Sequence, residues 1–139
     1  MKKTQKKDLT ALTLLGNGKK NTPSKKLEVF PNKSKNNYLI ELFTDEFTCL
    51  CPMTGQPDFA KIKISYVPAE KIVESKSLKL YLWSFRNEGC FHEHLTNVIL
   101  KDLTDALAPV WCKVEGDFNV RGGIGIKVSA QYGVRPEGI

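Results

Sequence analysis

Residues 74–87 read ESKSLKLYLWSFRN, and this stretch predicts a helix with two different faces. At 3.6 residues per turn, one side is apolar and carries Leu78, Leu82 and Phe85. A second side is basic and carries Lys76, Lys79, Trp83 and Arg86. Such a basic face is either a solvated surface above the core or a site that binds an anion. Glu74 and Ser75 stand at the helix start, where backbone N–H groups lack helical partners and a ligand could also dock.

Two strands are predicted before this helix. Residues 38–50 are rich in aromatic and aliphatic side chains and predict one long strand, with a bulge or bend at Asp45-Glu46. Residues 51–58 contain two prolines and a glycine and predict a loop. Residues 60–66 alternate between apolar and polar side chains, which is typical of a half-buried strand. The two strands should form a hairpin, preceded by irregular structure over residues 19–37.

A second helix and two more strands are predicted after residues 88–90. Pro109 ends the helix, and its buried side is marked by Phe91, Leu95, Val98, Ile99, Leu103 and Ala106. Residues 110–114 and 124–128 alternate as strands and are joined through glycines. The order strand, strand, helix, helix, strand, strand indicates an α+β fold with a four-stranded antiparallel sheet and both helices on one face. The open edges and second face of such a sheet predict an oligomer.

The length and the charge of the chain limit the classes of function that it can have. The chain has 139 residues and 41% hydrophobic content, which predicts a single domain. The net charge is +6, but residues 1–37 hold ten lysines against Asp8 and Glu28, so they carry +8 and the rest carries −2. Because the positive charge lies outside the expected folded body, we predict no direct nucleic-acid binding. Residues 1–11 predict a disordered lysine-rich tail, which leaves residues 12–139 as the domain.

The cellular context follows from the apolar runs and the cysteines. No apolar run approaches the roughly 20 residues that cross a bilayer, and no apolar signal segment follows the N-terminal lysines. We therefore expect a cytoplasmic protein without a membrane partner. The cysteines are expected to be reduced, because the chain is not a small cysteine-dense scaffold; they are Cys49, Cys51, Cys90 and Cys112.

Cys51 and Asp58 are the candidate reactive pair. A thiolate is a strong nucleophile when its pKa is lowered, and a carboxylic acid beside it can donate a proton. This pair suits addition to an electrophilic carbon, whereas the alternative is a buried structural cysteine and a turn-forming aspartate. If Cys51 forms a disulfide, the candidate partners are Cys49, Cys90 and Cys112.

His92 and Glu93 are the second candidate pair. A carboxylate in the first turn of a helix is favoured by the helix dipole, so capping is one interpretation. The other is that Glu93 accepts two N–H bonds from the amidine edge of a guanine-like ring, while His92 bonds the ring carbonyl or orients the base. Zinc is not predicted, because His92 and His94 lie two positions apart and point to different sides of a helix.

A dinucleotide would have to be held by side-chain charge. No G-x-G-x-x-G motif stands between a strand and a helix, and the glycine-rich segment RGGIG at residues 121–125 does not match it. The available cations are Lys76, Lys79, Arg86 and Arg121.

Several of these motifs together resemble one family. FTCLCPMTGQPDF at residues 47–59, ESKSLKLY at 74–81, SFRN at 84–87, FHE at 91–93 and RGG at 121–123 closely resemble the NADPH-dependent 7-cyano-7-deazaguanine reductases. These are the nitrile reductases of queuosine biosynthesis, a tRNA modification pathway. The match runs from about residue 12 to residue 132, and Glu-Ser-Lys-Ser-x-Lys-x-Tyr is the family's signature.

The resemblance implies a fold, an assembly and a role for each matched residue. The fold would be the tunnelling fold shared with GTP cyclohydrolase I, with pentameric rings stacked as a decamer and active sites between subunits. Cys51 would be the nucleophile that forms a covalent thioimidate, and Asp58 the proton donor. The substrate-binding positions would be Val73, Glu74, Ser75, His92 and Glu93. NADPH would be held by Lys76, Lys79 and Arg121.

Two other functions stay open on the residues alone. A zinc-dependent pterin-type hydrolase on the same fold would contain stoichiometric metal. A non-catalytic oligomeric module would bind a purine-like ligand without oxidising NADPH.

Overall fold

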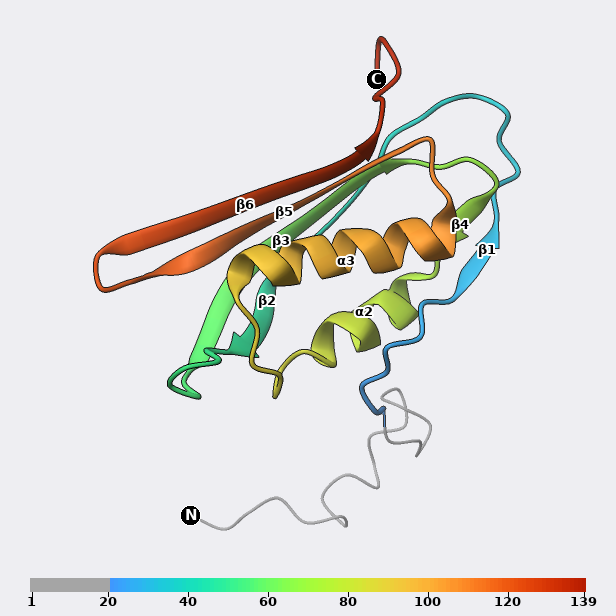
Figure 1. Cartoon of the computed structure of the whole chain (residues 1–139). Helices are drawn as coiled ribbons and strands as arrows, with labels where there is room; N and C mark the ends of the chain where they lie inside the picture. Colours follow the sequence, from blue (N-terminus) through green and yellow to red (C-terminus); the bar gives the residue numbers. More distant parts are fainter. Residues whose placement is uncertain (1–20) are drawn as a thin grey trace, which may run out of the picture.

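The computed structural model describes residues 21–139 (Figure 1). The predicted tail at residues 1–11 and the predicted domain start at residue 12 lie outside the described residues. In chain order the elements are β1 (Val29–Pro31), β2 (Ile40–Leu50), β3 (Pro57–Val67), β4 (Lys71–Val73), α2 (Ser75–Trp83), α3 (His92–Leu107), β5 (Trp111–Arg121) and β6 (Ile124–Gly133).

The main sheet has four antiparallel strands in the order β2-β3-β5-β6. Figure 1 shows α3 lying across one face of this sheet with α2 beside it. The predicted α+β class, the four-stranded antiparallel sheet and the order of its strands and the two helices along the chain are confirmed. The register shifts by one residue between Thr44 and Phe47, so the predicted bulge at Asp45-Glu46 is also confirmed.

The core lies between this sheet and the helices. Every second residue of β3, including Ile62, Ile64 and Tyr66, is buried against the helices. The buried side of α3 carries Leu95, Ile99, Leu103 and Leu107 at a spacing of four residues. The predicted buried side was partly wrong, because Phe91 and Val98 are 51% and 41% exposed and lie off this stripe.

Several predicted boundaries differ from the structure. Helix α2 ends at Trp83 instead of residue 87, and residues 84–88 continue in tighter turns whose N–H groups bond the carbonyl three residues back. The Ser84 hydroxyl donates to the Tyr81 carbonyl at 2.6 Å, which competes with further α-helix. Strand β3 begins at Pro57, so Asp58 lies in a strand and not in the predicted loop.

A two-stranded sheet was missed. Strand β1 lies in the region predicted to be irregular and pairs antiparallel with β4, placing Val29 opposite Val73. A three-residue strand with exposed side chains has no detectable period, so sequence alone could not reveal it. Within residues 21–139, neither helix combines the length and the apolar character that crossing a membrane requires.

Candidate active site

Cys51 follows directly on β2 and is fixed from two sides. On one side, its N–H donates to the Gln56 carbonyl at 2.8 Å, and the Gly55 N–H donates back to the Cys51 carbonyl at 2.8 Å. Gly55 has φ 69°, a conformation that glycine adopts readily. On the other side, Leu50 exchanges backbone hydrogen bonds with Glu88 and Cys90. The half-buried thiol is therefore held on rigid backbone at the end of a strand.

The surroundings of Cys51 favour its thiolate. Hydrogen bonds from the Thr54 hydroxyl and from the N–H groups of Thr54 and Met53 lower the pKa of Cys51, although burial and the charge of Asp58 oppose them. The pKa values of the other thiols shift in the opposite direction, because burial is the largest effect on them. It raises the pKa of Cys49 and of Cys112 to about 12 and also raises that of Cys90. All four are free thiols, and Cys51 is the one prepared to act as a nucleophile.

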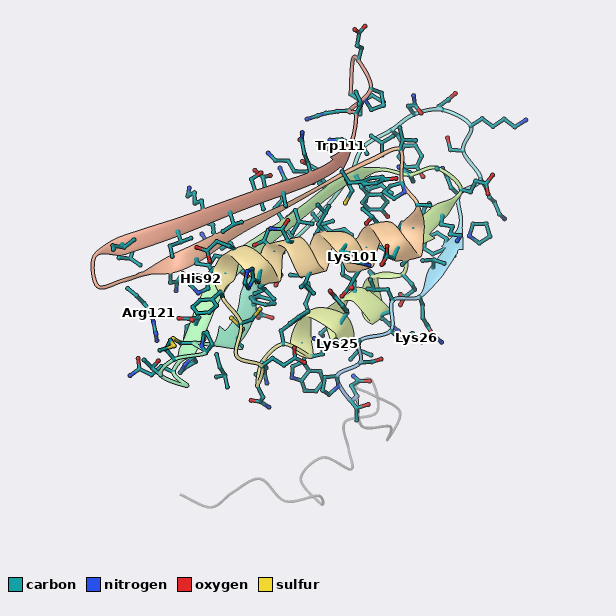
Figure 2. The ribbon with its side chains drawn as sticks, viewed as in Figure 1. Lys25, Lys26, His92, Lys101, Trp111 and Arg121 are labelled. Carbon is teal, nitrogen blue, oxygen red and sulfur yellow. The ribbon has the colours of Figure 1, made fainter. Side chains whose placement is uncertain are left out.

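Asp58 is the buried acid of this site. It is the second residue of β3, lies opposite Cys49 in the ladder and is 6% exposed. His92 Nε2 lies 3.2 Å from its Oδ2, and Arg121 Nε lies 3.1 Å from its Oδ1. Figure 2 shows His92 and Arg121 at the same end of the molecule. Three elements far apart in sequence thus meet at one carboxyl group beside Cys51.

His92 is held in place by packing. It is the first residue of α3, and its ring stacks on Phe118 with centroids 3.8 Å apart and planes 8° apart. Thr96 donates to the His92 carbonyl at 3.0 Å. A Cβ at Gly116 would lie 2.7 Å from the Phe118 ring, so only glycine leaves room for this stack. Sequence reasoning missed Phe118 and Thr54, because their contacts join elements with no local signal.

Glu93 follows His92 in the first turn of α3 and is exposed. The predicted pair therefore divides its contacts: His92 bonds the acid Asp58, while the Glu93 side chain faces outward beside it.

The other predicted binding residues gather at the start of α2. Val73 ends β4 and is buried, Glu74 caps the helix, and Ser75, Lys76 and Lys79 are exposed. The Glu74 carboxylate accepts from the N–H groups of Lys76 at 2.9 Å and Ser77 at 2.7 Å, which lowers its pKa. Two of the backbone N–H groups that could bind an anion at this helix start are therefore already bonded to Glu74.

These two groups of residues lie far apart within one chain. The Val73 N–H donates to the Tyr66 hydroxyl at 3.2 Å, so the start of α2 is next to Tyr66. Tyr66 and Asp58 both lie on β3, eight residues apart, which corresponds to about 26 Å of extended strand. In Figure 2, Trp111, whose β5 neighbour Cys112 pairs with Tyr66, is likewise far from Arg121. The structure brings together Cys51, Asp58, His92, Glu93 and Arg121, but not Val73, Glu74, Ser75, Lys76 and Lys79.

A groove of about 470 Å³ lies between α2 and β2. Its floor is apolar, and the basic face predicted for α2 contributes Lys79, Trp83 and Arg86 to its lining. Ser75 lines one end, whereas Cys51 and Asp58 are not part of it. The groove therefore extends from Ser75 on α2 to Thr48 on β2, whose hydroxyl donates to the Asp58 carbonyl at 2.9 Å, but it does not include the thiol.

Metal ligands do not converge in the part of the chain that the structure describes. Across residues 21–139, which include all four cysteines and both histidines, no three Cys, His, Asp or Glu side chains are placed to hold one ion. The ligand set that a zinc-dependent hydrolase needs is not assembled here.

A thiol with a lowered pKa near a buried acid that contacts His92 and Arg121 defines a class of protein that can add a cysteine to an electrophilic carbon. A family model described as QueF-like protein matches residues 57–137. The chain belongs to this family, which is that of the NADPH-dependent 7-cyano-7-deazaguanine reductases, and the resemblance inferred from the sequence motifs is confirmed.

Relatives that are 52% to 61% identical to this chain share one name. Proteins called NADPH-dependent 7-cyano-7-deazaguanine reductase from Syntrophus aciditrophicus and Anaeromyxobacter sp. (strain K) are each 61% identical, covering 94% and 84% of this chain and 93% and 97% of their own. One from Neisseria meningitidis is 52% identical over 91% of this chain and 83% of its own. A crystal structure of the archaeosine synthase QueF-Like in the apo form has a TM-score of 0.67 and 24% identity, covering 73% of this chain and all of that chain, which shows the same fold.

Proposed function

We propose that this chain reduces the nitrile of 7-cyano-7-deazaguanine to an aminomethyl group with NADPH, in queuosine biosynthesis. The observation that carries the proposal is that Cys51, alone among the four cysteines, has a lowered pKa, and that the charge of the buried acid Asp58 reaches its sulfur. The chain combines this site with up to 61% identity to reductases of that name.

The first step is an addition that needs no reductant. The Cys51 sulfur forms a bond to the nitrile carbon, one C–N π bond is lost, and the nitrogen gains a proton to give a covalent thioimidate. The thiol supplies that proton overall, and Asp58 is placed to pass it to the nitrogen. Hydrogen bonds from Thr54 and from backbone N–H groups lower the pKa of Cys51, which raises the fraction of the reactive thiolate.

The remaining steps move four electrons. NADPH supplies them as two hydrides when it is bound, and the thiolate of Cys51 leaves between them. The phosphates of NADPH need cations, and the exposed Lys76 and Lys79 with the free donors of Arg121 fit that requirement. Glu93 and Glu74 would read the amidine edge and the opposite side of the base, with Val73, Ser75 and His92 completing the pocket.

The binding site requires two chains. About 26 Å of strand separates Asp58 from Tyr66 and the start of α2, which is much longer than a bicyclic base. We therefore propose that the Cys51 end of one subunit meets the Val73-Glu74-Ser75 segment of a neighbour, as in a tunnelling-fold ring like that of GTP cyclohydrolase I. Strands β2 and β6 are the sheet edges that would pair between subunits, and two stacked pentamers are the assembly that the resemblance implies.

The location follows from the same chemistry. Four free thiols suit a reducing compartment, and NADPH is the reductant, so we place the reaction in the cytoplasm. No direct nucleic-acid partner is part of the proposal.

The test is the mass of the protein incubated with the nitrile base and no NADPH. Wild type should gain the mass of one substrate per active chain, on the peptide that contains Cys51, while Cys51→Ala should gain none. Adding NADPH should then release the aminomethyl product, with two NADPH oxidised for each. An unchanged wild-type mass would reject the covalent mechanism, and stoichiometric zinc with activity lost to chelators would favour the hydrolase instead.

A further inference from the structure

Arg121 makes two contacts to neighbouring residues of β3. Its Nε lies 3.1 Å from Asp58 Oδ1, and its Nη2 donates to the Pro57 carbonyl at 3.0 Å. A guanidinium presents its N–H groups in a rigid fork, so one side chain fixes both the acid and the backbone that carries it. Because His92 holds Oδ2, each oxygen of Asp58 has a partner of its own.

A β-bulge directs Arg121 toward this acid. Phe118 pairs with Ile126 but Arg121 pairs with Ile124, so β5 contains one extra residue between them. With regular alternation, Phe118 and Arg121 would lie on opposite faces of the strand, and the extra residue returns them to the same face. The turn that follows has φ 56° at Gly122 and 80° at Gly123, the conformation favoured for two-residue hairpins. The hairpin thus ends with Phe118 against His92 and Arg121 against Asp58.

We propose that Arg121 is a positioning residue for Asp58 in the addition of Cys51 to the nitrile, and so acts before any reductant is bound. This role rests on the proposed function. Held at both oxygens, the carboxyl group has one orientation, from which it can deliver a proton to the nitrogen. Arg121 is 42% exposed and uses two of its five N–H groups here, so the others remain available for a phosphate. The positioning role and the cofactor role can therefore coexist in one side chain.

The addition step isolates the new role, because it takes place without NADPH. We would measure the rate constant of adduct formation by quenched mass spectrometry across nitrile concentrations for wild type, Arg121→Ala and Arg121→Lys. Arg121→Ala should lower the saturating rate constant by roughly tenfold or more while the half-saturating concentration stays within about twofold. Arg121→Lys should be intermediate, since one ammonium cannot span both acceptors. Millimolar guanidinium should partly restore Arg121→Ala.

Two further variants make the result specific. Lys127→Ala removes a cation from the same hairpin, paired with Asp117 at 3.5 Å and 80% exposed, and should keep the wild-type rate. In an Asp58→Asn background, Arg121→Ala should cause little additional loss, because it acts through Asp58.

The outcomes separate this role from the reaction itself. A wild-type rate of adduct formation in Arg121→Ala, with only NADPH oxidation lost, would overturn the positioning role and leave the proposed function standing. The absence of any adduct on wild type would refute the covalent mechanism of the proposed function and this role with it.

Discussion

At the scale of single residues, the reactivity of Cys51 depends on its hydrogen bonds. Thr54 supplies the largest contribution that lowers its pKa. Thr54→Val removes the hydroxyl, so the pKa of Cys51 should rise and a smaller thiolate fraction should exist at pH 7. Alkylation of Cys51 by iodoacetamide, followed by peptide mass, should slow roughly three- to tenfold, a size expected for the net contribution of one hydrogen bond.

Thr44→Val is the control for this prediction, because the Thr44 hydroxyl bonds the Glu46 N–H within β2, on the far side of the bulge from Cys51. Its Cys51 should be alkylated at the wild-type rate. Equal rates in all three proteins would show that the hydroxyl of Thr54 does not stabilise the thiolate.

The candidate reactive residues could be picked out at this scale, and the residues that support them could not. Cys51 and Asp58 stand out because a cysteine before a proline and an acid across a short loop suggest chemistry by residue type. Neither Thr54 nor Phe118 is a residue type that suggests chemistry by itself. Phe118 supports the site because its ring stacks on the His92 ring, and this contact between β5 and α3 exists only in the folded chain.

At the scale of elements, the close packing between β5 and α3 sets the position of His92. A Cβ at Gly116 would lie 2.7 Å from the Phe118 ring and 3.0 Å from Thr96 Oγ1. Gly116→Ala should therefore push the ring away from His92, destabilise the fold by about 1–3 kcal/mol as overpacking does, and slow adduct formation. Thermal unfolding and the adduct assay would measure the two effects.

Gly125→Ala is a matched control on the neighbouring strand β6, where the new Cβ would meet a Val120 methyl at an ordinary 3.4 Å. It should change neither stability nor adduct formation appreciably. If Gly116→Ala behaved in the same way, the packing of Phe118 would be looser than these contacts indicate.

The cap at the start of α2 leads to a prediction of how the stability of the fold depends on pH. The Glu74 pKa is lowered by the N–H groups of Lys76 and Ser77, so it is lower in the folded state than in the unfolded state. The stabilisation is complete above the unfolded pKa of roughly 4.3 and is lost as pH falls through the folded value. Glu74→Gln, which cannot ionise, should lower the melting temperature at pH 7 and show a smaller decline below about pH 4 than wild type.

The elements themselves were largely predictable, with errors at their ends. Alternation and helical spacing identified four strands and two helices in the right order, because each buries one face. The extension of β5 beyond residue 114 was missed, since Gly116 takes an inward position without an apolar side chain and the apolar Val120 is exposed, so both interrupt the pattern. The bulge that aims Arg121 lies in that missed part.

At the scale of the whole molecule, the distance between the two groups of site residues could not be predicted from sequence. Glu74 and Asp58 are sixteen positions apart in the chain, yet β3 runs the length of the sheet between them. Sequence motifs drew attention to both groups but could not show that one chain keeps them at opposite ends. That separation follows from an eleven-residue strand and is the strongest structural argument for a site shared between subunits.

A mixed assembly tests this directly. Cys51→Ala and Glu74→Ala should each be inactive alone, the first without a nucleophile and the second without a binding contact. When the two chains are co-expressed with different tags and purified through both, some sites will combine Cys51 of one chain with Glu74 of the other. With random mixing, one site in about four receives both intact halves, so activity should return to roughly a quarter of wild type. If Cys51 and Glu74 of the same chain formed each site, no mixture of these two chains would reduce the nitrile.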